Sequence, residues 1–121
     1  MADDEMNFRF GFERLEVWRF SLDAMEVAHR VANRLPARYA ELAEQIRDAS
    51  QSMCGNLAEG VGKEGRDQIR FFMIARGSTY ETAGRIEMAY TLKLIDAELR
   101  LTAREKLRPV AAILTRLTRP R

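Results

Sequence analysis

The stretch from Leu42 to Gly84 constrains the fold most, because it joins two helical patterns through a short turn rich in glycine. The first pattern repeats apolar residues every three or four positions, at Leu42, Ile46, Ala49, Met53 and Leu57. This spacing matches 3.6 residues per turn and predicts a helix, from about 37–40 to Gly60, with one buried face. A second helix is expected from about Arg66 to Lys93. The two helices therefore predict a packed hairpin.

A row of polar residues accompanies the apolar face of this hairpin. Its members are Gln45, Ser52, Asn56 and Glu59 in the first helix, and Arg76, Ser78 and Glu81 in the second. Polar groups beside a core can be buried only when they find hydrogen-bond partners. We therefore predict a structural polar seam, in which Glu59 pairs with Arg76 across the hairpin or across a subunit boundary. The alternative is that both side chains are solvated, as long charged side chains usually are.

Two further amphipathic patterns flank the hairpin. The first predicts a helix from about Glu13 to Leu35, which ends there because Pro36 disfavours helical geometry in the residue before it. The last helix begins either at Asp96 as a cap, or later at a capping box that starts with Thr102. Four amphipathic helices with short connections predict an all-α fold, an up-and-down antiparallel four-helix bundle. The domain boundaries are then 1–12 for an extended N-terminal arm, 13–118 for the bundle and 119–121 for a basic tail.

The expected arm has one apolar face, because Phe8, Phe10 and Phe12 recur with a period of two. A single extended segment has no sheet to join in a helical domain. We therefore expect it to lie across a helix groove of this chain or of a neighbouring subunit. The first and third helices also carry apolar arcs wider than one bundle needs, which indicates self-association. The candidate interface residues are Phe8, Phe10, Phe12, Trp18 and Phe71.

Composition narrows the class of protein. A chain of 121 residues with 46% hydrophobic and 31% charged residues fits one globular domain. No run approaches about 18 uninterrupted apolar residues, so we expect no membrane span. The N-terminus is acidic and lacks a secretory signal, and the single cysteine, Cys54, excludes an internal disulfide. These features favour a cytoplasmic protein.

Charge is distributed unevenly along the chain, although the net charge is only +2. Residues 1–60 hold 7 Lys/Arg against 11 Asp/Glu, whereas residues 61–121 hold 13 against 7. Within the last helix, Arg100, Arg104 and Arg108 recur every four residues and share one face. A basic end of this kind is a candidate surface for phosphate, although ordinary surface arginine explains it equally well. The candidate nucleic-acid-binding residues are Arg100, Arg104, Lys106, Arg108, Arg116, Arg119 and Arg121.

The sequence offers no catalytic constellation. Its one histidine, His29, and its one cysteine, Cys54, fall on different predicted helices. Catalysis needs a converging nucleophile, base and orienting group, or a metal cluster. No zinc-protease, phosphate-loop or dinucleotide motif is present. We therefore expect a protein that is not an enzyme, with no cofactor, no metal and no small-molecule substrate.

Four blocks of the sequence resemble a known family. They are FERLEVW at 12–18, LAEQIRDA at 42–49, SMCGNLAEG at 52–60 and RFFMIARGSTYE at 70–81. Over roughly residues 12–94 the chain is similar to the four-helix bundle proteins named for intervening sequences of bacterial 23S ribosomal RNA genes. That resemblance implies a four-helix bundle that assembles as a ring-shaped homopentamer. A related branch serves as an accessory factor to the reverse transcriptases of diversity-generating retroelements.

Two functions follow from the residues and the resemblance together. The first is an oligomeric accessory module whose partner is RNA, DNA or a nucleic-acid enzyme such as a reverse transcriptase. The second is a structural or protein-binding oligomer without nucleic-acid binding. Aromatic residues are not interleaved with the basic residues of the last helix, so base stacking is not indicated for the first function.

Overall fold

The computed structural model describes residues 10–120, without the side chain of Arg14. Four long helices and two short 3-10 turns account for nearly all of this range. In chain order they are η1 (Gly11–Arg14), α2 (Glu16–Arg34), η2 (Ala37–Tyr39), α3 (Ala40–Val61), α4 (Gly65–Thr91) and α5 (Ala97–Leu117). The described part of the chain contains no strand, so the predicted all-α class with four helices is confirmed.

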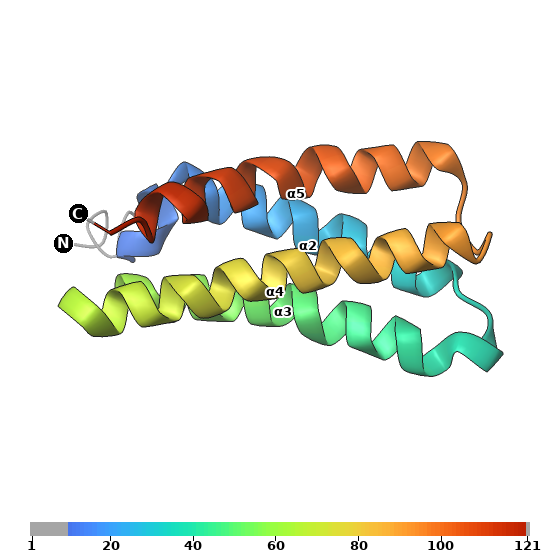
Figure 1. The fold of residues 1–121 in the computed structure, drawn as a ribbon, viewed down its shortest axis with the longest axis horizontal. Coiled ribbons are helices and arrows are strands. Elements are labelled where there is room, and N and C mark those ends of the chain that lie inside the picture. The colour runs from blue at the N-terminus through green and yellow to red at the C-terminus, as the bar shows by residue number, and fades with distance from the viewer. Residues whose placement is uncertain (1–9, 121) are drawn as a thin grey trace, which may run out of the picture.

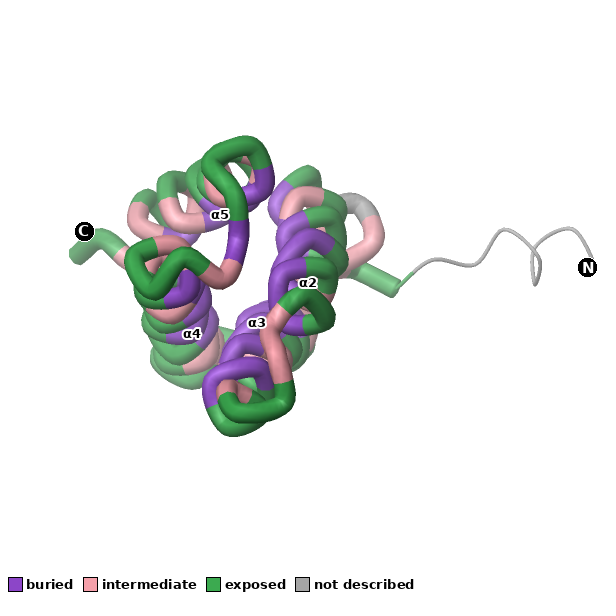
Figure 2. Tube along the Cα trace, turned by 90° about the vertical axis from the view of Figure 1, so that its right-hand side faces the viewer, coloured by how far each residue is buried: buried purple, intermediate pink, exposed green. Residues whose placement is uncertain are grey.

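The helices pack in the order in which they occur. α3 lies between α2 and α4, and α5 lies between α4 and α2, so that α2 and α4 occupy one diagonal of the bundle. α3 and α5 occupy the other diagonal, and within residues 10–120 none of their Cα atoms approach within 8 Å. Figure 1 shows the connections α2–α3 and α4–α5 at one end and the connection α3–α4 at the other. Figure 2, along the long axis, shows that the buried positions of all four helices face one another.

The core follows from the apolar spacing of each helix. From α3, Ile46, Met53 and Leu57 are fully buried, as their positions on one stripe predict. α4 and α5 contribute Ile86 and Leu114, which are buried to the same extent. Val31 of α2 is also fully buried. Burial of such side chains is worth roughly 1.5–3 kcal/mol each relative to exposure, so this layer holds the four helices together.

An N-cap at Asp96 fixes the residue at which α5 begins. The Asp96 carboxylate accepts a hydrogen bond from the Leu99 amide at 2.8 Å, which satisfies a donor that the first turn leaves unpaired. Thr102 lies inside the helix and its hydroxyl donates to the Glu98 carbonyl at 3.0 Å. The earlier of the two predicted starts is therefore correct, and the later one is wrong.

The beginning of the bundle differs from the prediction. Gly11–Arg14 form a 3-10 turn, and Leu15 is extended between this turn and α2. Within the turn, Phe12 packs against Trp18 with ring centroids 4.6 Å apart, and Phe10 stacks on Phe12 at 5.6 Å. The aromatic contacts fold this segment onto α2, so the expected extended arm does not reach position 12 and the helix does not begin at position 13. Phe8 and residues 1–9 lie outside the described residues.

Cys54 occupies a closed site between α2 and α3. Its thiol donates to the Ser21 carbonyl at 3.3 Å, and the residue is buried. Burial raises the pKa of the Cys54 thiol, which keeps it protonated at neutral pH. None of the helices between residues 10 and 120 combines the length and hydropathy that a membrane span requires.

Candidate functional site

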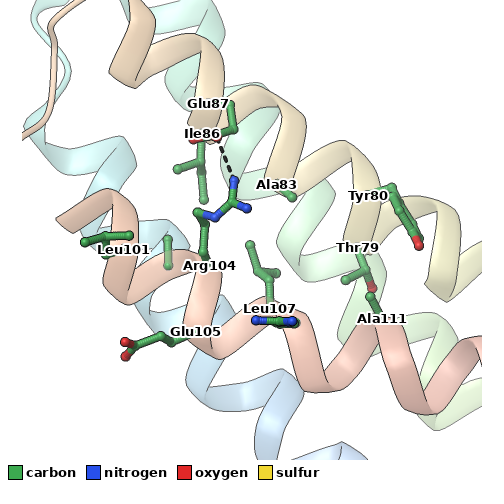
Figure 3. Close-up of a pocket in the computed structure, with 12 residues that line it drawn as sticks. Thr79, Tyr80, Ala83, Ile86, Glu87, Leu101, Arg104, Glu105, Leu107 and Ala111 are labelled. Atoms are coloured by element: carbon green, nitrogen blue, oxygen red, sulfur yellow. Dashed lines mark hydrogen bonds and ion pairs between the residues drawn. The ribbon is translucent and has the colours of Figure 1, made fainter. Parts of the chain in front are cut away.

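The basic face predicted for the last helix is largely engaged with α4. Both carboxylate oxygens of Glu87 accept hydrogen bonds from Arg100, at 2.7 and 2.8 Å. Arg104, one turn further along α5, donates to the same carboxylate at 2.8 Å. Figure 3 shows the contact between Arg104 and Glu87 at the edge of a groove. We call these three residues the Glu87 cluster.

Electrostatics within the Glu87 cluster support its structural role. Hydrogen bonding from Arg100 holds the pKa of the Glu87 carboxyl below its ordinary value, and the charges of both arginines add to this effect. The same bonds raise the pKa of Arg100. The guanidinium of Arg100 also lies 4.7 Å from the ring centroid of Tyr90. Two of the three arginines on the predicted face therefore tie α5 to α4.

The other basic residues of α5 do not form one surface. Arg108 lies one turn beyond Arg104 on the flank that faces α4. Lys106 is two residues away from Arg108, so it projects about 200° around the helix. Among the residues that the structure describes, Lys106, Arg108, Arg116 and Arg119 are exposed and form no ion pair. Arg121 lies outside the described residues.

Five of the seven residues of the predicted polar seam form side-chain contacts along α3 and α4, in two clusters. In the first, the hydroxyls of Ser52 and Ser78 lie 2.8 Å apart, and the Asn56 amide donates to Ser52 at 3.0 Å. Asn56 also donates to the Ser52 carbonyl at 2.9 Å, so its position is fixed within its own helix. These short polar side chains satisfy one another beside the core, as buried polar groups require.

The second cluster of the seam is centred on a residue that the sequence analysis missed. Arg85 donates to the Gln45 side chain at 2.8 Å and forms an ion pair with Glu81 at 3.2 Å. A Glu four residues before an Arg on a helix commonly forms an ion pair, so the sequence could have predicted the contact between Glu81 and Arg85. Gln45 and Glu81 thus belong to the seam as predicted, but through Arg85.

The predicted pairing of Glu59 with Arg76 across the hairpin is wrong. Glu59 lies 3.6 Å from Lys63, one turn along the chain, and is exposed. Arg76 donates to the Thr115 hydroxyl at 2.8 Å and lies 4.9 Å from the centroid of the Tyr80 ring. The reason is geometric: Arg76 precedes Ser78 by two residues, and about 200° of helix rotation turns it from α3 toward α5. Pairing across a subunit boundary stays a prediction.

A groove between α4 and α5 has a volume of about 660 Å³. Figure 3 shows the apolar side chains that line it and the charged residues beside them. The lining comprises Thr79, Tyr80, Ala83, Ile86, Glu87, Leu101, Ala103, Arg104, Glu105, Leu107, Arg108 and Ala111. Tyr80 and Leu101, at its two margins, are 54% and 52% exposed. Sequence periodicity did not indicate this groove, because it arises from the separation of two helices and not from either helix alone.

Apolar and aromatic residues are also exposed at the start of the bundle. Phe10 is 57% exposed and Leu22, one turn beyond Trp18 on α2, is 36% exposed. Phe12 and Trp18 are half-buried between them. Phe71, the remaining interface candidate, is half-buried and lies under Arg70, whose guanidinium is 4.5 Å from the ring centroid. The structure thus groups Phe10, Phe12 and Trp18 and places Phe71 apart from them on α4.

One protein family matches the chain across almost the whole bundle. The model of the 23S rRNA-intervening sequence protein family matches residues 13–116. The chain belongs to this family. The match extends from within η1 to the last turn of α5, so the α4–α5 groove lies inside it and Phe10 and Phe12 lie before it. No curated protein matches the chain at a significant level. Within residues 10–120, no three His, Cys, Asp or Glu side chains are placed to hold a metal ion.

Proposed function

We propose that this member of the family is a binding module without enzymatic activity that works as a homo-oligomer in the cytoplasm. Its repeating unit is the up-and-down antiparallel bundle, and five copies form the ring that the family resemblance implies. The observation that carries the proposal is the exposure of large apolar side chains on two separate surfaces. One surface includes Phe10 and Leu22, and the other includes Tyr80 and Leu101.

Exposed apolar area of this kind favours association. Single exposed apolar residues are normal, but clusters that line a groove or stack into a patch mark interaction sites. Phe10 and Phe12 stack on each other, and the groove lined by Tyr80 and Leu101 has an apolar floor. Removing both surfaces from water lowers the free energy of the assembly by roughly 25 cal/mol for each Å² of apolar area buried.

Light scattering coupled to size-exclusion chromatography tests the proposal. We expect a single species near five times the chain mass of 13.9 kDa. Its mass should persist on dilution to micromolar concentration, because interfaces that bury a large apolar area dissociate slowly. A monodisperse monomer under these conditions would contradict the proposal.

Nucleic acid, or an enzyme that acts on it, is the second candidate partner. The observation that favours it is the charge of α5, which holds Arg100, Arg104, Lys106, Arg108 and Arg116 against Glu98 and Glu105. A ring repeats this excess once per copy, and multivalency converts weak phosphate contacts into useful avidity. Glu87 forms ion pairs with Arg100 and Arg104. The residues that would contact phosphate are therefore the exposed Lys106, Arg108, Arg116 and Arg119.

Fluorescence anisotropy with a labelled RNA and a matched DNA tests this second function. Replacing Lys106, Arg108, Arg116 and Arg119 by Gln should weaken binding equally for all sequences, because phosphate contacts carry no base information. The slope of affinity against salt should also become shallower by about one unit per lost contact. Arg66→Gln/Arg70→Gln, two exposed arginines at the start of α4, is the matched control. A wild-type protein that binds neither probe at low salt would leave the protein-binding oligomer as the function.

A further inference from the structure

We propose that the α4–α5 groove binds an amphiphilic carboxylate, a molecule with an apolar chain and a single carboxylate group, such as a medium-chain fatty acid. The chain lies along the floor of the groove, and the carboxylate pairs with Arg104 and Arg108 on the α5 rim. This site goes beyond the proposed function and does not depend on the number of copies in an assembly.

The floor of the groove is apolar along about two turns of each helix. Ala83 and Ile86 line it from α4, and Leu107 and Ala111 line it from α5. The small alanine side chains leave space above the larger ones, which an apolar chain can fill. Thr79 also lines the groove, but its hydroxyl already donates to a backbone carbonyl of its own helix at 2.8 Å. The floor therefore favours a ligand that brings no polar group to it.

The groove has the size of a small-ligand site. Its volume of about 660 Å³ falls within the range of roughly 300–1,000 Å³ that is typical of such sites. Along α4, the lining extends from Thr79 to Glu87, a rise of about 12 Å. An extended acyl chain of roughly eight to ten carbons, with C–C bonds of about 1.5 Å in a zigzag, has a similar length. Figure 3 shows Arg104 beside Glu87 toward one end, and Tyr80 and Ala111 near the other.

The α5 rim of the groove carries two guanidinium groups with free donors. Arg104 uses its Nη1 atom to bind Glu87 at 2.8 Å, and its Nε and Nη2 atoms have no hydrogen-bond partner among the described residues. Arg108, one turn further along α5, is exposed and forms no ion pair within residues 10–120. A planar guanidinium can bind a carboxylate through two parallel hydrogen bonds, so these side chains suit this anion.

The charge around the groove favours an anion that carries a single charge. Three arginines, Arg100, Arg104 and Arg108, lie in the groove or beside it. Glu87 and Glu105 bring two negative charges, so one net positive charge remains. A monocarboxylate complements this charge, whereas a cation or a multiply charged anion is opposed by one sign or the other.

One margin of the groove is fixed before any ligand arrives. The guanidinium of Arg76 lies 4.9 Å from the centroid of the Tyr80 ring, which holds this exposed ring against α4. Arg76 is itself fixed by its hydrogen bond to the Thr115 hydroxyl at 2.8 Å. A site whose margin is already ordered loses little conformational entropy when it binds a ligand.

Isothermal titration calorimetry with three amphiphiles of equal chain length tests the choice of ligand. The probes are decanoate, decanol and decyltrimethylammonium, each used below the concentration at which it forms micelles. We expect decanoate to bind one molecule per chain. Decanol and the cation should bind at least about tenfold more weakly, because neither accepts a charge-assisted hydrogen bond from the arginines as a carboxylate does.

Substitutions on the floor test the place of binding. Ala83→Leu and Ala111→Leu each put a larger apolar side chain where the acyl chain lies, so each should weaken decanoate binding by about tenfold or more. Both positions are partly exposed and leucine is a good helix former, so both variants should fold, which circular dichroism verifies. In amide NMR spectra of the wild-type protein, decanoate should shift the signals of Ala83 and Ala111 most.

Substitutions on the rim should have opposite signs. Arg108→Gln removes a donor that no other residue between positions 10 and 120 uses as an ion pair, and should weaken decanoate binding by about tenfold. Glu105→Gln removes a nearby negative charge and should strengthen it by about twofold to threefold. Arg66→Gln/Arg70→Gln, at exposed positions outside the groove, is the matched control and should leave the affinity unchanged.

Several results would overturn this site. A wild-type protein that does not bind decanoate has no such site. Equal affinity for all three amphiphiles would mean adsorption to apolar surface without recognition of the carboxylate. Binding that persists in both Ala83→Leu and Ala111→Leu would place the ligand elsewhere.

The outcome is also distinguishable from that of the proposed function. A monomeric wild-type protein that binds decanoate in the groove retains this site and overturns the homo-oligomer. A homo-oligomer that does not bind decanoate retains the proposed function and overturns only this site. Light scattering and calorimetry on the same preparation give both results.

Discussion

The two flanks of α4 are held in different ways. Toward α3 the contact is closed: a Cβ on Gly60 would lie 2.8 Å from the ring of Phe72, and the Ser52 and Ser78 hydroxyls meet beside the core. Toward α5 the contact is tied at its margin by the Glu87 cluster and leaves a groove of about 660 Å³. The α3 flank of α4 is therefore closely packed within the chain, whereas the α5 flank borders an open groove.

This difference separates stability from recognition. Tight packing and the hydrogen bonds of the polar seam, including those of Arg85, close the flank toward α3, so changes there should act on the free energy of unfolding. The charged and partly exposed residues toward α5 contribute little to stability, because water competes with exposed ion pairs. Changes there should act on assembly instead. The following substitutions test this division, from the largest expected effect to the smallest.

Phe72→Ala should have the largest effect on the closed flank. Phe72 is buried, and truncating a buried phenylalanine costs about 3–5 kcal/mol through lost burial and the cavity left behind. The adjacent Met73→Ala is the control, because Met73 is exposed and should change stability by less than about 0.5 kcal/mol. Urea unfolding monitored by circular dichroism measures both. Equal costs at the two positions would mean that α4 is not packed as described.

The same glycine-to-alanine change should have opposite signs at two positions. At Gly60 the added methyl group collides with the buried Phe72 ring, and overpacking of this kind costs about 1–3 kcal/mol. At Gly84 nothing lies within 4 Å of the added atom, so alanine should stabilise the helix by up to about 1 kcal/mol through its better propensity. Thermal unfolding compares the two variants. A stabilising Gly60→Ala would contradict the tight approach of α3 and α4.

The serine pair of the seam should show coupling in a double-mutant cycle. A neutral hydrogen bond contributes about 0.5–1.5 kcal/mol net, so Ser52→Ala and Ser78→Ala should each cost about that amount. Because both lose the bond between the two hydroxyls, the double variant should cost less than the sum of the single variants. Strict additivity would mean that the hydroxyls do not interact.

Glu87→Gln should have the smallest effect on stability, and that effect should depend on pH. Since the pKa of Glu87 is lowered in the folded protein, its contribution is present above the unfolded pKa of about 4.3 and is lost as pH falls through the folded pKa. The substitution should cost less than about 1 kcal/mol at pH 7, and this cost should shrink toward pH 3. Unfolding curves across this range measure the difference. A cost that grows on acidification would contradict the lowered pKa.

Periodicity predicted the helices well because it depends only on residues three and four positions apart. The helices of the α3–α4 hairpin and the membership of Ser52 and Ser78 in its polar row follow from such local spacing, and the Asp96 cap follows from its place just before an apolar pattern. Near the start of the described residues, alternation predicted an extended arm through Phe12, but the packing of Phe12 against Trp18 folds that residue back as part of a 3-10 turn.

The candidate site was harder to predict, because its residues are combined by packing. Arg100 and Arg104 were assigned to phosphate from their spacing alone, and nothing in that spacing reveals that Glu87 on another helix binds both. The choice of partner for Arg76 likewise depends on which flank of α4 faces α5. The groove itself has no sequence signature. Spacing along the sequence identified the polar and basic residues, but only the fold shows which residues they contact.

Because Cys54 is buried between α2 and α3, its reactivity can be used to measure the separation of these two helices. A thiol-specific reagent needs both access and a thiolate, and the buried hydrogen bond to Ser21 withholds both while α2 and α3 remain together. Alkylation at neutral pH therefore proceeds only through molecules in which this pair of helices has opened. Its rate measures how often that opening occurs in the native ensemble, at one atom and without any added label.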